Sequence, residues 1–150
     1  MSTENSNRTR ADGARMDVPA LQALLSDVFA TWVQELGLVV RTAADDGVVL
    51  DLPVHPRHVH AGGVMCGQTL MAAADTALVL AISHRLGGFR PMTTVQLQTS
   101  FLRPVPRTVE AVRVTARILK SGRSLVFGEV ALTLPDGELA AHATSTSALL

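Results

Sequence analysis

Cysteine is almost absent from this sequence: Cys66 is the only one among 150 residues. A single cysteine cannot form an intramolecular disulfide, and it cannot supply the several thiolates of a cysteine-rich zinc site. Disulfide-stapled and cysteine-rich zinc domains are therefore excluded. A lone thiol fits a reducing compartment, so we expect a cytoplasmic protein.

An excess of either charge is also missing, because 13 Lys and Arg balance 13 Asp and Glu. No overall field therefore favours nucleic acid or an anionic membrane as a partner. Residues 1–16 are polar and lack the apolar region of a secretory signal. The longest strongly apolar stretch, residues 69–82, is shorter than the ~20 residues that span a bilayer. We expect neither nucleic acid nor a membrane as a partner.

The length and the 47% hydrophobic content are enough for one buried core. We expect residues 1–16 to form a disordered tail and residues 17–150 to form a single domain. From Val18 to Leu36 apolar residues recur at helical spacing, and Gly37 stands where a C-terminal cap would, which predicts one amphipathic helix.

A second helix is expected over residues 68–85, which are apolar on nearly every side and are followed by Gly87. Such a helix should be buried all round. Residues 38–42 and 48–52 flank the turn sequence Asp45-Asp46-Gly47, which predicts a hairpin with Gly47 available for a positive φ.

Strand-like runs follow in the C-terminal half, separated by Pro- and Gly-containing turns, and predict an antiparallel meander. One of them alternates apolar and polar residues, so that one face meets the core. The four runs are residues 94–102, 109–120, 124–134 and 138–149. Together the elements predict an α+β fold, in which an antiparallel sheet wraps around a central buried helix and an additional N-terminal helix is present.

Asp75 is the only ionisable side chain between Gln68 and Ser83. Burying a carboxylate is costly unless something uses it. A carboxylate in apolar surroundings accepts a proton more readily than one in water, which suits a general base or a nucleophile. The alternative is that Asp75 pairs with a core group or points into a subunit interface. Thr76 beside it fits either role.

The segment from Gly62 to Gly67 leads directly into this helix, where unpaired backbone N–H groups and the positive end of the helix dipole meet. Such N–H groups could hold a carbonyl oxygen as it becomes an oxyanion. The alternative is that the glycines serve tight turns and close packing. About 12 Å of helical rise separates Gly67 from Asp75, so an antiparallel partner helix would be needed to bring the two together.

Two segments carry a resemblance to a known family. Residues 63–77, from Gly63-Val64-Met65-Cys66-Gly67 to Asp75-Thr76-Ala77, resemble the signature of the PaaI-like (phenylacetate-pathway) acyl-CoA thioesterases. Residues 93–104, which end in Phe101-Leu102-Arg103-Pro104, are similar to a strand of the same family. Gly122-Arg123 and Gly137-Glu138-Leu139 also match it in order. The resemblance covers roughly residues 37–148 and implies the hotdog fold.

This resemblance implies hydrolysis of an acyl-CoA thioester to a free acid and CoA. Asp75 would act as nucleophile or general base, the amides of Gly67 and Gln68 would polarise the carbonyl, and Thr93 or Thr94 would position the attacking water. No cofactor is implied, since CoA enters as part of the substrate. Active sites would lie between two subunits of a homodimer, with a homotetramer formed as a dimer of dimers.

The chain departs from the family pattern at three positions. Cys66 replaces the usual His, Gln68 replaces the second Gly, and His60 stands near the usual Asn. A thiol is a short, weak donor and does not replace an imidazole. At a helix N-terminus Cys66 could itself be a nucleophile, although a small buried Cys is the plainer interpretation. His60 could donate to the substrate carbonyl in place of the missing His.

Basic residues predict where the CoA phosphates bind, because guanidinium groups bind phosphate bidentately and Lys adds a point charge. The alternative for these residues is a solvated edge. The candidate substrate-binding residues are Gly63, Met65, Thr76, Arg103, Lys120, Gly122 and Arg123, with Arg90 as a further possibility. His55, His58 and His60 share one loop but lack a carboxylate at ligand spacing, so we expect no metal site.

Two other functions stay open at this point. One is a non-catalytic acyl-CoA or acyl-ligand binding protein that keeps the fold and has lost hydrolysis. The other is a dehydratase of hydroxyacyl thioesters, but the D-x-N-x-x-H pattern of that family is not present in the sequence.

Overall fold

The computed structural model describes residues 14–45 and 47–150. Residues 1–13 of the predicted tail and the turn residue Asp46 lie outside the described residues. Met16 contacts the fold through its backbone N–H, which donates to the carbonyl of His84 at 3.3 Å. The Met16 carbonyl in turn lies 2.6 Å from Nδ1 of His84.

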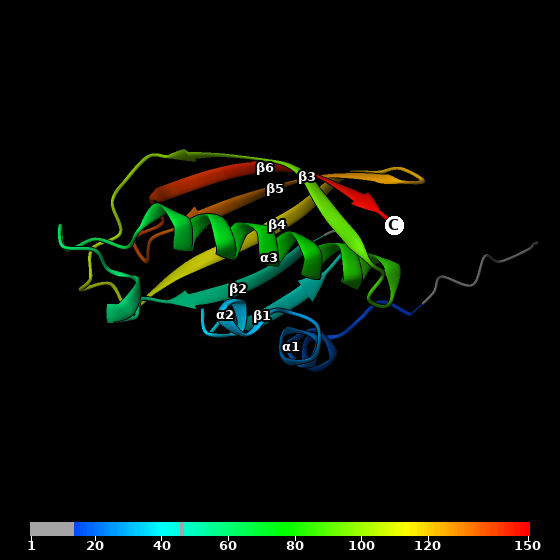
Figure 1. Cartoon of the computed structure of the whole chain (residues 1–150), viewed down its shortest axis with the longest axis horizontal. Coiled ribbons are helices and arrows are strands. Elements are labelled where there is room, and N and C mark those ends of the chain that lie inside the picture. Colours follow the sequence, from blue (N-terminus) through cyan, green and yellow to red (C-terminus); the bar gives the residue numbers. More distant parts are fainter. Residues whose placement is uncertain (1–13, 46) are drawn as a thin grey trace, which may run out of the picture.

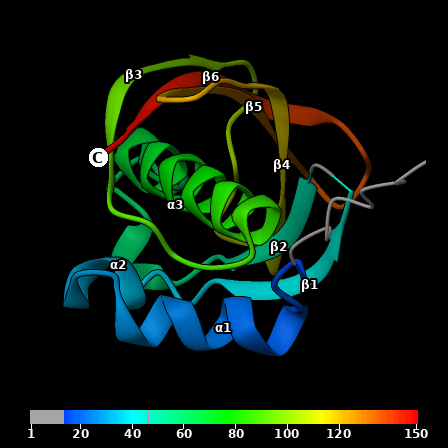
Figure 2. The same ribbon diagram turned by 90° about the vertical axis from the view of Figure 1, so that its right-hand side faces the viewer.

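Six strands form one antiparallel sheet in the order β1-β2-β4-β5-β6-β3. Figure 1 shows the long helix α3 (Gly67–Leu86) lying across one face of this sheet, and Figure 2 shows the sheet curving around it. The predicted α+β arrangement is confirmed. The strands are β1 (Val39–Ala44), β2 (Gly47–Pro53), β3 (Met92–Phe101), β4 (Ala111–Ser121), β5 (Leu125–Thr133) and β6 (Leu139–Leu149).

The core lies between α3 and the inner face of the sheet. Alternate residues of β4 are fully or almost fully buried, as the period-two pattern predicted: Val112, Val114, Ala116 and Ile118. The helix ends where Gly87 adopts a left-handed conformation with φ of 77°, which glycine reaches without strain. Among the described residues, no helix is both long and apolar enough to cross a membrane.

The prediction of one helix from Val18 to Leu36 is wrong. Two short helices, α1 (Val18–Asp27) and α2 (Thr31–Gln34), replace it, and they lie beside β1 in Figure 2. Ala30 between them is extended, with ψ of 149°. The side-chain amide of Gln34 donates to two backbone carbonyls at the end of α1. Apolar spacing continues through the break, so the pattern alone could not reveal it.

The predicted C-terminal meander is correct for β4, β5 and β6 and wrong for β3. β3 pairs with β6 at the far edge of the sheet, because β2 already occupies the side of β4 that β3 would need. The β1–β2 turn also differs from its prediction. Asp45 carries the positive φ, at 47°, whereas Gly47 is needed for space, since a Cβ there would lie 2.8 Å from the carbonyl oxygen of Ala116.

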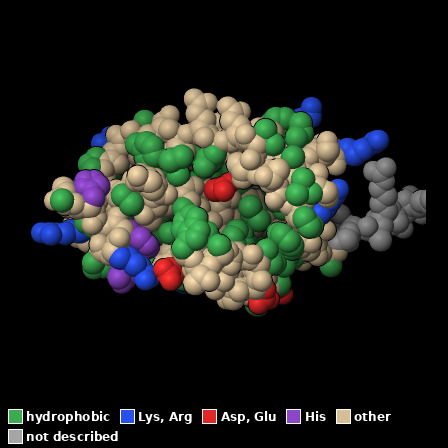
Figure 3. Space-filling model, viewed as in Figure 1, with side chains coloured by type: hydrophobic (Ala, Val, Ile, Leu, Met, Phe, Trp, Pro, Cys, Tyr) green, Lys and Arg blue, Asp and Glu red, His purple; other side chains and the backbone are tan. Residues whose placement is uncertain are grey.

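One face of the molecule stays partly open along α3 and the edge strand β3. Val95 and Phe101 of β3 are 61% and 51% exposed, and Leu102 just beyond is 56% exposed. Figure 3 shows an acidic group recessed among hydrophobic and uncharged atoms near the middle of this side, with Lys and Arg gathered toward its ends. The residues of α3 that are not buried near this strand include Gln68, Met71, Ala72, Asp75 and Val79.

Candidate active site

The Asp75 carboxylate is held by a hydroxyl from the neighbouring strand. Thr94 of β3 donates a hydrogen bond to Oδ1 of Asp75 at 2.7 Å. The pairing of β3 with β6 shifts between Thr94 and Gln96, which is the irregularity of a β-bulge and re-aims nearby side chains. Thr94 is half-buried and Thr93 is exposed. Of the two candidate threonines, it is Thr94 that contacts the acid.

Oδ2 of Asp75 has no hydrogen-bond partner within the described part of the chain. A carboxylate with one oxygen fixed and the other free can accept a proton from a water molecule or attack a carbonyl carbon. Thr76, the next residue, is turned away from such a role. Its hydroxyl donates to the carbonyl of Ala72 within the helix at 2.8 Å, and it is only 4% exposed.

The N-terminus of α3 is fixed by the backbone on both sides. The N–H of Met65 donates to the carbonyl of Val105 at 2.8 Å, and that of Cys66 donates to the carbonyl of His58 at 2.8 Å. The N–H groups of Gly67 and Gln68 begin the helix and have no intrahelical acceptor. Both N–H groups are therefore without a helical partner, and the oxyanion-binding role that the resemblance implies for these two residues stays a prediction.

Cys66 occupies the N-cap position but its side chain does not cap the helix. Its sulfur lies 3.0 Å from the hydroxyl oxygen of Thr69. The thiol is half-buried and engaged in this contact.

A pocket of about 400 Å³ opens beside these N–H groups. A Cβ on Gly67 would lie 3.1 Å from the ring of Phe101, so glycine lets the ring approach the helix. The lining is apolar except for one arginine, which suits the apolar part of an acyl thioester. Its residues are Met65, Gly67, Leu70, Phe101, Leu102, Arg103, Pro104 and Val105.

Asp75 does not line this pocket, which agrees with the helical rise between Gly67 and Asp75. Within one subunit the structure brings Asp75 to Thr94 and brings Gly67 to Met65 and Arg103, but it does not join the two groups. Sequence reasoning missed Leu70, Phe101 and Leu102 as pocket residues. The Phe-Leu-Arg-Pro motif was the available signal for two of them, while Leu70 was hidden in a uniformly apolar helix.

The candidate phosphate-binding residues are divided between the two ends of the sheet. Arg103 lies near the start of α3 and pairs with Glu138 at 3.1 Å, with both side chains 54% exposed. Lys120, Gly122 and Arg123 lie at the β4–β5 turn, which Figure 1 shows at the opposite end. Arg90 is also at that end, with Nε 3.4 Å from the carbonyl of Leu150.

The three loop histidines have separate environments around η1 (Pro56–His58). Nδ1 of His55 accepts from the N–H of Arg57. Burial lowers the pKa of His58, and the nearby charges of Arg57 and His55 lower it further. His60 lies in another pocket, with Gly63. No group of three His, Cys, Asp or Glu residues is arranged to hold a metal ion in residues 14–45 and 47–150.

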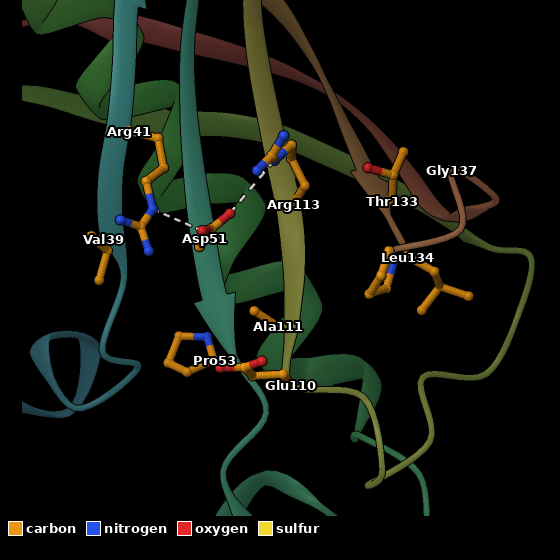
Figure 4. Close-up of a pocket in the computed structure, with 11 residues that line it drawn as sticks. Val39, Arg41, Asp51, Pro53, Glu110, Ala111, Arg113, Thr133, Leu134 and Gly137 are labelled. Atoms are coloured by element: carbon orange, nitrogen blue, oxygen red, sulfur yellow. Dashed lines mark hydrogen bonds and ion pairs between the residues drawn. The ribbon is translucent and has the colours of Figure 1, made fainter.

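A larger pocket of about 630 Å³ is lined by residues of β1, β2 and β4 and by the end of β5 with the turn after it (Figure 4). Asp75 is not among its lining residues. Its central acid, Asp51, pairs with Arg41 at 2.8 Å and Arg113 at 3.6 Å. These charges largely satisfy one another, and none of the predicted site residues lines the pocket. The candidate site is therefore Asp75 together with the N-terminus of α3, in spite of this pocket's size.

A family model described as the thioesterase superfamily matches residues 62–141. The match includes the N-terminus of α3, Asp75 and the strand that carries Thr94. No curated protein gives a significant match to the chain.

Solved structures share the fold over most of their length. A conserved protein from Pseudomonas aeruginosa is 27% identical, with a TM-score of 0.75 over 83% of this chain and 98% of that one. A thioesterase from Haemophilus influenzae is 22% identical, with a TM-score of 0.81 over 92% and 93%. The PaaI protein from the phenylacetic acid degradation operon of Escherichia coli is 16% identical, with a TM-score of 0.76 over 86% and 89%.

Proposed function

The chain belongs to the thioesterase superfamily, and we propose that it hydrolyses an acyl-CoA thioester to a free acid and CoA. The observation that carries this proposal is the Asp75 carboxylate, held at one oxygen by Thr94, on the helix whose first N–H groups adjoin an apolar pocket. Acyl transfer to water needs a base and a site that stabilises the oxyanion.

The proposed reaction follows from the free oxygen of Asp75. That oxygen takes a proton from water as the water oxygen bonds to the thioester carbon, or it attacks the carbon itself and water later releases the acid. The carbonyl oxygen becomes negative and is stabilised by the N–H groups of Gly67 and Gln68. The carbon–sulfur bond then breaks, and CoA leaves as a thiolate that takes up a proton. No cofactor is required, and the lone Cys66 fits a cytoplasmic setting.

We further propose that the complete site lies between two subunits. Asp75 and Gly67 are about 12 Å apart along α3, too far to act on one carbonyl group. A second α3, antiparallel to the first, would bring the partner's helix N-terminus to Asp75. The exposed apolar side chains of Val95 and Phe101 along β3 support such a homodimer. The dimer of dimers remains a proposal from family resemblance.

A second candidate is a ligand-binding protein without turnover. The specific observation in its favour is Cys66, whose thiol lies against Thr69 where the resembling family has a histidine. In that case the pocket would still bind an acyl-CoA, but no thiol would be released.

The deciding experiment uses wild type, Asp75→Asn and Asp51→Asn with a panel of aryl- and fatty-acyl-CoA esters. Free thiol release measures turnover, and calorimetry measures binding. We expect Asp75→Asn to lose at least ~100-fold in kcat while still binding, because a positioned base contributes about 10²–10⁴-fold. Asp51→Asn removes a carboxylate outside the site and should keep its activity. Tight binding without turnover by wild type would establish the ligand-binding candidate instead.

Mixing two inactive variants tests the shared site. Asp75→Asn supplies an intact helix N-terminus, and Gly67→Pro, which lacks one N–H group, supplies an intact acid. Random mixed dimers contain one complete site each, so about a quarter of wild-type activity should return. A mixture as inactive as its components would mean that each subunit builds its own site.

A further inference from the structure

A separate pocket of about 360 Å³ lies on the loop that precedes α3. Two basic residues, His60 and Arg107, line it from segments far apart in the sequence, and no Asp or Glu belongs to its lining. The remaining surface is small and apolar. The lining residues are Val54, Pro56, Val59, His60, Ala61, Gly63 and Arg107.

The ring of His60 is held in one orientation. The N–H of Gly62 donates to Nδ1 of His60 at 2.9 Å, so in the neutral ring the proton is on Nε2, which is then a donor. A Cβ at position 62 would lie 2.7 Å from the ring. Gly62 is therefore needed for the ring to fold back over its own loop.

Arg107 lies in the loop between β3 and β4 and differs in its ion pairing from the arginines of the strands. Arg41, Arg113 and Arg117 each pair with a carboxylate of a neighbouring strand. The guanidinium of Arg107 has no ion pair among the residues that the structure describes, and the residue is exposed. Its backbone is fixed, because its N–H donates to the carbonyl of Gly63 at 3.1 Å. Arg107 therefore adds a positive charge without an ion pair among the described residues, on a backbone that is fixed at the pocket.

Gly63 leaves room in the lining of this pocket. It has a φ of 81°, and a Cβ added there would meet nothing within 4 Å. The space beside the backbone is thus open. A histidine donor, an arginine and apolar residues in the lining of one pocket are a combination that favours a tetrahedral oxyanion attached to an organic group.

We propose that His60 and Arg107 bind a phosphate group in this pocket. Gly63-Val64-Met65 pairs with Val105-Pro106-Arg107 as a short antiparallel ribbon, so the pocket lies along the backbone that leads to Gly67. The four residue-to-residue steps from Gly63 to Gly67 span at most ~14 Å. A flexible arm between phosphate and thioester would cover this distance. The assignment to the nucleotide end of a CoA ester rests on the proposed function; phosphate binding itself does not.

Calorimetry with adenosine 3′,5′-bisphosphate and with inorganic phosphate tests the site without any turnover. We expect Arg107→Gln and His60→Gln each to weaken bisphosphate binding about tenfold, as the loss of a charge-assisted hydrogen bond does. Arg41→Gln removes the same charge from the outer face of the sheet and should bind as wild type does. Bisphosphate binding that exceeds phosphate binding identifies a nucleotide ligand; equal binding identifies the free ion as the ligand of the same site.

The proposal is overturned if wild type binds neither probe, or if Arg107→Gln loses no more affinity than Arg41→Gln. A measurement of KM tests whether the site contributes to hydrolysis. Arg107→Gln should raise KM for an acyl-CoA and leave KM unchanged for the matching acyl-pantetheine, which lacks the nucleotide. If the protein binds the bisphosphate through Arg107 but releases no thiol, the phosphate site is supported and the proposed thioesterase activity is contradicted.

Discussion

The two ends of α3 are built for different purposes. At its N-terminus the side chain of Cys66 makes no capping bond, and the first N–H groups lie beside an open pocket. At its C-terminus the N–H of Gly87 donates to the carbonyl of His84, and the N–H of Gly88 donates to the carbonyl of Ser83. The N–H groups without a helical partner therefore lie at the end that adjoins a pocket. The backbone at the other end is held by its own hydrogen bonds.

The side chains follow the same division. Residues 80–84 in the second half of α3 are all buried, whereas the first half carries Gln68, Met71 and Asp75 at exposed or half-buried positions. A carboxylate in the second half would be costly because it would lie in apolar surroundings. Substitutions at the two ends should therefore separate activity from stability.

Between the two ends of α3, the larger effect on turnover is expected at Gly67. Gly67→Pro removes one free N–H group, and proline is tolerated at the first helical position, since Cys66 before it is already extended with ψ of 146°. We expect kcat to fall by about 10²–10³, as for loss of an oxyanion donor. Thiol-release assays measure kcat, and thermal melts check the fold.

Gly67→Ala is the matched control, because it adds a Cβ near Phe101 but keeps the N–H group. We expect a much smaller loss of kcat and equal or higher thermal stability, since alanine favours a helix over glycine. Equal losses in both variants would show that the ring of Phe101, rather than the missing donor, limits turnover.

At the C-terminal end of the helix we expect a substitution to lower stability and to leave turnover unchanged. Gly87→Ala places a side chain at φ of 77°, which should cost about 1–2 kcal/mol of unfolding free energy. Urea titration measures this loss, and kcat per folded molecule should not change. A drop in kcat at full stability would mean that the two ends are coupled.

A smaller effect is expected for Thr94→Val, which keeps the shape of the side chain and removes the hydrogen bond to Asp75. We expect kcat/KM to fall about tenfold, close to 1.4 kcal/mol, with little change in stability because Asp75 remains accessible to water. Thr93→Val in a parallel assay decides between the two threonines. A larger loss at position 93 would contradict the role given to Thr94.

The smallest effect concerns pH and the loop that carries His58. Burial lowers the pKa of this histidine from its ordinary 6.5, so the unfolded chain binds a proton more readily than the native state does. Stability from this group is present above about pH 6.5 and is lost as pH falls through the lower native pKa. Urea midpoints between pH 8 and pH 5 should fall less in His58→Gln than in wild type. Identical slopes would remove His58 as the cause.

Local patterns predicted the fold well. The helix over residues 68–85, the end at Gly87 and the alternation in β4 depend on near neighbours, and all three are confirmed. The resemblance to hotdog thioesterases is confirmed by the family match and the shared fold. The break at Ala30 was missed because Gln34 satisfies the end of α1 through its side chain, without changing the apolar spacing.

Features that depend on distant residues were not predictable in the same way. Thr94, which contacts Asp75, lies beside a bulge that belongs to the pairing of β3 with β6. Arg107 and His60 line the same pocket although they are far apart in the sequence, because two loops form a short ribbon. The sequence also gave no indication that Lys120 and Arg103 lie at opposite ends of the sheet. Spacing along the chain contains none of this geometry.

The placement of β3 at the sheet edge has a consequence for the time course of folding. β3 is made directly after α3, yet its partner in the sheet is β6, several dozen residues later. While the chain is being synthesised, β3 cannot form its hydrogen bonds in the sheet until β6 has been made. Such non-local pairing is slow to form. The strand that holds the Asp75 carboxylate in position is therefore expected to be among the last elements to settle in a newly made chain.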